Sequence, residues 1–172
     1  DIAKFKGDKL IAHIDGVGDP STYQDLLKLI QGIQKIKNFS EIALQTNAHL
    51  LNKELIQDLK KAGLNKIHIS IHSLNENLSK ELFGNKSYNI NHIKDICKEI
   101  VNNEIELWIN PVLLPKTNEE DIKEIIEFVK EIKCNIGIQK YEIHKYGRKL
   151  KQKQSWFHFY QQLKQFEKEH NL

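Results

Sequence analysis

Methionine is absent from this chain of 172 residues, and its only cysteines are Cys97 and Cys134. Two cysteines so far apart exclude a disulfide framework and a cysteine-based metal knuckle, so we expect both to be buried thiols. No apolar run approaches the roughly 20 residues that a membrane span needs, and the first residues lack the apolar core of a signal peptide. The sequence therefore predicts a soluble, cytoplasmic protein.

An excess of charge of one sign is also lacking, because 26 Lys and Arg residues face 23 Asp and Glu residues, for a net charge of +3. A net charge this small does not identify nucleic acid as a partner. Hydrophobic residues make up 40% of the chain, which is enough for a sizeable core and excludes a mainly disordered protein. We expect a single domain over residues 1–172, with a C-terminal helix over residues 155–172.

Short apolar stretches alternate with helical patterns along the chain. The strands are expected at residues 10–14, 42–45, 66–71, 105–111 and 136–139. Between them, apolar residues three and four positions apart predict amphipathic helices. The expected N-caps are Ser21, Asn52, Asn118 and Ser155, and Gly63 is expected to end a helix. This alternation is typical of a parallel sheet, in a doubly wound α/β fold or in part of a (β/α) barrel.

One face of the predicted sheet is polar. In the third strand, three isoleucines alternate with His68, Ser70 and His72. The same alternation places further polar or aromatic residues on that face: His13, Asp15, Gln45, Asn47, Trp108, Asn110, Gln139 and Tyr141. The pattern favours a curved sheet whose concave face holds a polar ligand. The alternative is a face that simply meets solvent, although the strands lack the Lys and Glu typical of solvated faces.

A glycine-containing turn follows the first predicted strand, in the segment Asp15-Gly16-Val17-Gly18-Asp19-Pro20. Glycine lets the backbone approach a ligand closely, and the exposed amide and carbonyl groups of such a turn can hold an ammonium or a carboxylate. Taken alone, these residues are better explained by ordinary turn chemistry.

Motifs at the ends of successive strands carry a family resemblance. In chain order they are Gly18-Asp19-Pro20, Thr46-Asn47-Ala48, Ser70-Ile71-His72-Ser73, Asn110-Pro111-Val112 and Gly137-Ile138-Gln139-Lys140-Tyr141. Together they resemble the radical S-adenosylmethionine (SAM) superfamily over about residues 10 to 148, and within it an archaeal branch of uncharacterised Fe–S oxidoreductases. The resemblance implies an α/β fold: a partial (β/α) barrel with five mainly parallel strands alternating with helices.

The resemblance also implies a cofactor and the residues that hold it. The turn at Gly18, Asp19 and Pro20 would hold the methionine amino group of S-adenosylmethionine, and Thr46, Asn47 and Ser70 would face its ribose and carboxylate. Asn110 and the backbone near Gln139 would lie close to ribose and adenine. The expected substrate pocket is lined by His13, His72, Trp108 and Tyr141.

The chain departs from the family in one respect. Family members bind a 4Fe–4S cluster with three cysteines in a C-x3-C-x2-C loop, and this sequence has no such loop. Cys97 and Cys134 fall on or at the end of predicted helices, so no metal ligands are expected in this chain. We expect the cluster to be ligated by a preceding segment or a separate polypeptide. The combined enzyme would generate a 5′-deoxyadenosyl radical, and this portion would not be competent alone.

Two other functions remain open on the sequence. Histidines on one face suggest a zinc-dependent barrel hydrolase, although His68 and His72 stand about 13 Å apart along an extended strand. Lys145, Arg148 and Lys149 suggest RNA binding, or else a solvated charged face. The chain would then be a catalytically silent RNA-binding or scaffold subunit.

Overall fold

The computed structural model describes residues 6–142 and 154–171. Its main sheet has five parallel strands in the order β1 (Leu10–Ile14), β2 (Phe39–Thr46), β3 (Lys66–Ile69), β4 (Glu106–Ile109) and β6 (Asn135–Ile136). A small parallel sheet pairs β5 (Val112–Leu113) with β7 (Gln139–Lys140). The spatial order follows the chain order, which confirms the predicted α/β fold.

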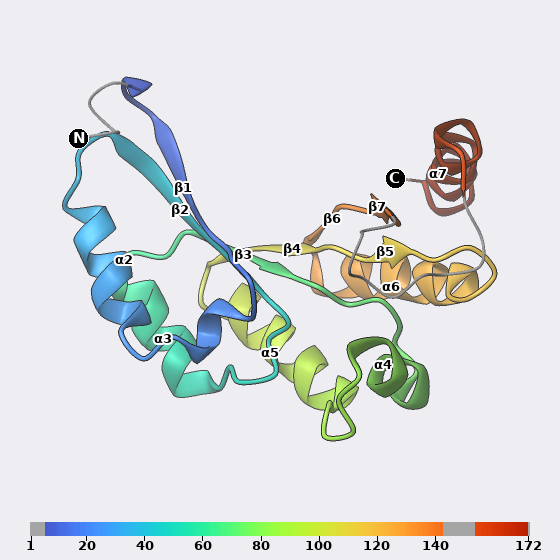
Figure 1. Ribbon diagram of the computed structural model, residues 1–172, viewed down its shortest axis with the longest axis horizontal. Helices are drawn as coiled ribbons and strands as arrows, with labels where there is room; N and C mark the ends of the chain where they lie inside the picture. The colour runs from blue at the N-terminus through green and yellow to red at the C-terminus, as the bar shows by residue number, and fades with distance from the viewer. Residues whose placement is uncertain (1–5, 143–153, 172) are drawn as a thin grey trace.

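Helices connect the strands, as Figure 1 shows. They are α2 (Leu26–Gln34), α3 (Lys53–Ala62), α4 (Glu76–Phe83), α5 (Ile90–Asn102), α6 (Glu119–Ile132) and α7 (Trp156–His170), with a 3-10 turn, η1 (Pro20–Thr22). Contacts join α2 to α3, α3 to α5, α5 to α6 and α6 to α7. In Figure 1, α2, α3 and α5 lie along one face of the sheet. No helix in the described ranges has both the length and the apolar character to cross a membrane.

The two faces of the sheet differ as the alternation predicts. Ile67, Ile69 and Ile71 have no exposed surface and belong to the core. His68 and His72, between and after them, are only partly buried. Apolar side chains on one side of each strand therefore pack against the helices, and the other side stays polar.

Several helix ends are where the sequence places them. Asn52 caps α3 by accepting a hydrogen bond from the Leu55 N–H, and Gly63 ends that helix with a φ of 107°. Ser155 caps α7 in the same way, with the His158 N–H as donor. These caps depend on residues within one helical turn, so local sequence is sufficient to predict them.

The N-cap prediction at Ser21 is wrong, and the one at Asn118 is right in position only. Ser21 lies inside η1, whose cap is Asp19, and α2 begins only at Leu26. Asn118 stands at the start of α6 but makes no capping bond. Its side chain accepts from the Leu114 N–H and donates to backbone oxygens of His72 and Val112. The Asn118 amide nitrogen thus serves contacts to other segments instead of capping α6.

The fourth and fifth predicted strands are each divided into two. Residues 105–111 hold β4, and β5 follows after Asn110 and Pro111; β6 and β7 are separated by Gly137 and Ile138. Backbone bonds continue across both breaks, from the Gly137 N–H to Ile109 and from the Gln139 N–H to Pro111. Proline has no N–H to donate, which accounts for an interruption at that position.

Candidate functional site

A cavity of about 310 Å³ lies at the carboxyl ends of β1, β2 and β3. Its lining consists of Asp15, Gly18, Asp19, Pro20, Gln45, Thr46, Asn47, Ser70, His72 and Phe83. Parallel strands bring their carboxyl ends to the same edge of a sheet, and loops distant in sequence meet there. The structure thus brings together six of the eight residues expected to bind the cofactor, and one of the four expected to contact substrate.

Asp19 joins the first two loops of this cavity. Its carboxylate accepts hydrogen bonds from the Ser21 N–H at 2.9 Å, the Thr46 hydroxyl at 2.8 Å and the Asn47 N–H at 2.6 Å. Burial acts to raise the pKa of Asp19, but the hydrogen bonds from Asn47, Ser21 and Thr46 outweigh it and hold the pKa below its ordinary value. The ionised side chain therefore connects the loops after β1 and β2 by hydrogen bonds.

The loop after β2 is also closed by its own side chains. The Thr46 hydroxyl oxygen accepts from the Ala48 N–H at 3.0 Å, and the Asn47 side-chain oxygen accepts from the His49 N–H at 2.9 Å. Ala48 adopts a left-handed conformation with a φ of 63°. These bonds hold the turn in one shape without any ligand.

Ser70 follows β3 on the same rim. Its N–H donates to the Thr46 carbonyl at 3.1 Å, and its hydroxyl oxygen accepts from the Gln45 side-chain amide at 3.1 Å. A serine hydroxyl that accepts one bond still has its own hydrogen to donate. Ser70 is thus able to donate to a ligand in the cavity.

His72 lines the cavity with a neutral ring. Its Nδ1 accepts from the Val112 N–H at 3.1 Å, and the ring stacks on Phe83 with centroids 5.1 Å apart. Burial lowers the pKa of His72 to about 4, so the ring carries no charge at neutral pH. The cavity therefore has acidic groups on the loop after β1 and uncharged donors on the loop after β3.

Three predicted residues lie on the polar face of the sheet but do not line this cavity. The His13 and Trp108 rings flank that of His68, with centroid distances of 5.2 and 6.1 Å. Asn110 is 9% exposed, and its side-chain nitrogen lies 3.2 Å from His68 Nδ1. Its buried side-chain oxygen has no hydrogen-bond partner within the described part of the chain.

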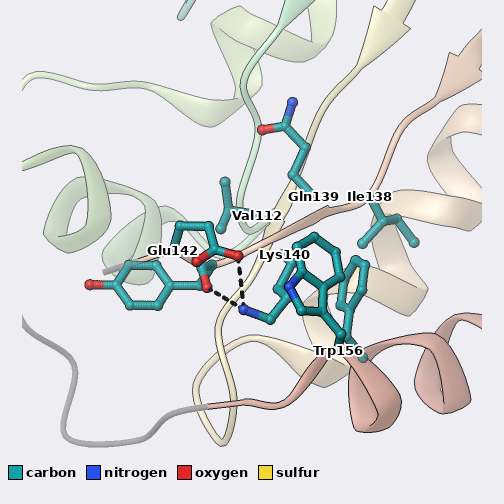
Figure 2. A pocket seen from close by; sticks show the side chains of 8 residues that line it. Val112, Ile138, Gln139, Lys140, Glu142 and Trp156 are labelled. Carbon is teal, nitrogen blue, oxygen red and sulfur yellow. Dashed lines mark hydrogen bonds and ion pairs between the residues drawn. The ribbon is translucent and has the colours of Figure 1, made fainter. Parts of the chain in front are cut away.

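Gln139 and Tyr141 line a second cavity of about 640 Å³ beside α7, shown in Figure 2. Apolar side chains of Val112, Ile138 and Phe159 form much of its wall. Lys140 lies there with its ammonium 3.0 Å from the Glu142 carboxylate and 4.9 Å from the centre of the Trp156 ring. Gln139, expected to bind the cofactor, and Tyr141, expected in the substrate pocket, are thus separated from the residues that line the first cavity. Lys145, Arg148 and Lys149 lie outside the described residues.

Three residues of the main cavity are missing from the predicted site. Asp15 and Gln45 belong to the same polar alternation as the predicted residues, so the sequence carried a signal for them. Phe83 ends α4 and carried no such signal, because only the tertiary fold brings that helix over the loop after β3.

The structure offers no set of metal ligands in the described ranges, 6–142 and 154–171, where no three His, Cys, Asp or Glu residues are placed to share an ion. His68 contacts Asn110, and His72 accepts from Val112. The zinc-hydrolase hypothesis therefore gains no support. Burial raises the pKa of Cys97, and it raises the pKa of Cys134 to about 12. Both side chains therefore favour the neutral thiol over the thiolate that an Fe–S cluster needs.

Comparison with known proteins identifies the family of this chain. The sequence model of the Radical SAM superfamily matches residues 2–129. The chain belongs to the radical SAM superfamily. An uncharacterized archaeal relative, MJ0103 of Methanocaldococcus jannaschii, is 36% identical over 174 residues, which cover 90% of the chain and 40% of that protein. The GTP 3′,8-cyclase of Aquifex aeolicus is 32% identical over 121 residues, 70% of the chain and 36% of that enzyme.

Solved radical SAM proteins share the fold. Streptococcus suis SuiB bound to S-adenosylmethionine superposes with a TM-score of 0.75 and 20% identity, over 90% of this chain and 35% of SuiB. A domain of the pyruvate-formate lyase-activating enzyme of Bacteroides vulgatus gives 0.65 and 17%, over 96% of both chains. The predicted partial barrel is confirmed. The chain spans about two fifths of the length of the curated relatives named above.

Proposed function

We propose that this radical SAM chain is the S-adenosylmethionine-binding part of an enzyme that works together with a cluster-bearing segment. When bound and reduced by one electron, the cofactor supplies methionine and a 5′-deoxyadenosyl radical that removes hydrogen from substrate. The observation that carries the proposal is the meeting of Gly18, Thr46, Asn47 and Ser70 in one cavity at the strand ends. The GTP 3′,8-cyclase relatives support an enzyme of this superfamily.

The chemistry of the cavity fits this cofactor. A zwitterionic amino acid and two ribose hydroxyls need several convergent hydrogen-bonding groups, and the lining supplies carboxylates, amides and hydroxyls. The described lining includes no Lys or Arg, so a positively charged sulfonium would meet no like charge there. In this arrangement Asp19 holds the two loops in place, while Ser70 and the backbone near Gly18 face the ligand.

The cluster is proposed to be held outside this chain. Its ligands would be thiolates, and both cysteines here favour the neutral thiol. Among the described residues, β1 pairs with β2 alone, so its other edge is open to a further strand. Ile11 on β1 is 58% exposed, an exposure that a covering segment would remove. A strand bearing the cluster loop would thus be placed beside the cavity.

The test is equilibrium binding of S-adenosylmethionine to the full-length protein, with its cluster reconstituted anaerobically. Ser70→Ala removes the donor at the cavity and should weaken binding about 10-fold, the size expected for a hydrogen bond to a charged group. Ser40→Ala is the matched control, because Ser40 is an exposed serine near the other end of β2. Equal binding by both variants, or no binding by the parent protein, would refute the proposal.

A further inference from the structure

The imidazole of His72 is held in a single position in the cavity wall. Its Nδ1 accepts from the Val112 N–H, and its ring lies nearly parallel to Phe83, at 15°. The carbonyl oxygen of His72 accepts a hydrogen bond from the Asn118 side chain at 2.6 Å. Side chain and backbone are thus anchored separately, so the ring cannot turn without breaking a hydrogen bond.

These contacts also determine where the ring proton sits. A backbone N–H can only donate, so the Nδ1 facing Val112 must be the unprotonated nitrogen. In a neutral imidazole the hydrogen is then on Nε2. The acidic residues that line the same cavity are Asp15 and Asp19. Burial keeps the ring neutral beside them, since it lowers the pKa of His72 to about 4.

Groups that favour an ammonium follow one strand, and groups that favour a carboxylate follow another. Asp15, Gly18 and Asp19 follow β1, whereas Ser70 and His72 follow β3. Strands β1 and β3 flank β2, so they lie about 9.6 Å apart. One α-amino acid group, with a hydrogen bond of about 2.9 Å at its ammonium and another at its carboxylate, spans the distance between these strands. The cavity therefore suits an α-amino acid group, with its ammonium toward β1 and its carboxylate toward β3.

We propose that His72 donates its Nε2 hydrogen to the carboxylate of the methionine moiety of S-adenosylmethionine, beside the hydroxyl of Ser70. This inference rests on the proposed function and assigns His72 to the cofactor, whereas the sequence placed it in the substrate pocket. A neutral donor is suited to this place, because it binds a carboxylate without adding positive charge near the sulfonium.

The experiment compares two ligands on the full-length protein, by equilibrium dialysis of S-adenosylmethionine and of its decarboxylated form. His72→Phe keeps a ring to stack on Phe83 but has no donor, and it should weaken binding of S-adenosylmethionine about 10-fold or more. Its affinity for the decarboxylated ligand should change less than about twofold. His72→Gln restores an N–H donor and should recover part of the lost affinity.

His49→Phe is the matched control. His49 stacks on Tyr88 at 6.0 Å and does not line the cavity, so this variant should bind both ligands like the parent protein. Because His72→Phe also removes the acceptor for the Val112 N–H, thermal unfolding is measured for each variant to confirm that it is folded. The inference is overturned if His72→Phe weakens both ligands equally, or neither. Failure of the parent protein to bind S-adenosylmethionine would instead overturn the proposed function.

Discussion

At the scale of single residues, Asp19 shows how one carboxylate can organise a binding site. It accepts hydrogen bonds from two loops, and these bonds keep it ionised in spite of burial. The resemblance assigns the Gly18-Asp19-Pro20 turn to the amino group of the cofactor, and the structure adds a role within the protein itself. The charge of Asp19 lies beside the expected ammonium position while its oxygens hold the loops together.

Replacing Asp19 by Asn should destabilise the protein by about 1.5–3 kcal/mol at pH 7, because an amide group would face donors that need an acceptor. The loss should depend on pH. Since the folded-state pKa of Asp19 lies below its ordinary value, the stabilisation is fully present above that ordinary pKa and is lost as pH falls through the lowered pKa. Urea unfolding between pH 7 and 3 measures the difference. Asp25→Asn, whose partner Lys28 is exposed, should cost less than about 1 kcal/mol.

At the scale of elements, two glycines in neighbouring segments differ in backbone conformation and in the space available for a Cβ. Gly63 ends α3 in the left-handed region, and a Cβ there would overlap the end of the Gln34 side chain. Gly32 lies within α2, with open space where a Cβ would be. Only the first position requires glycine, because of its left-handed backbone conformation.

The pair of substitutions Gly63→Ala and Gly32→Ala should therefore have opposite effects. Alanine at Gly63 should cost about 1–2 kcal/mol of unfolding free energy, because L-residues with a Cβ are strained in the left-handed region. Alanine at Gly32 should stabilise by about 0.5–1 kcal/mol, because it favours the helix. Urea denaturation measures both, and a loss of stability at Gly32 would show that its open surface is covered in the full-length protein.

At the scale of the whole molecule, the edge of the sheet at β1 has no neighbouring strand among the described residues, and the proposed cluster-bearing strand would occupy it. Backbone amides of an edge strand exchange with solvent faster than those of a strand with neighbours on both sides. In the described part of the chain, β3 has two neighbours and β1 has one.

Amide hydrogen exchange of the full-length protein tests this arrangement. If a further strand pairs with β1, residues 10–14 should exchange as slowly as residues 66–69 of the central strand. Fast exchange at residues 10–14 would show that the proposed cluster-bearing strand does not pair with β1. The β3 amides serve as the internal reference, since both their neighbours lie within this chain.

Several features could be predicted because they depend on short-range rules. Alternation along β3 indicated which side of the sheet is apolar, and Asn52 and Gly63 marked the ends of α3. The prediction for Ser21 is wrong because Asp19 caps the 3-10 turn that precedes α2. That turn is held by Thr46 and Asn47, almost thirty residues away along the chain, and no local rule contains such a contact.

The sequence by itself determined the order of strands and helices, the polar face and the membership of the radical SAM superfamily, since periodicity and motif order are properties of neighbouring residues. Only the tertiary structure decided that His72 shares the cavity of Gly18 and Ser70, while Gln139 and Tyr141 line another. The physical reason is that a site at the edge of a sheet is made by loops from different strands. Their relative positions depend on strand twist, on breaks such as that at Pro111 and on distant hydrogen bonds.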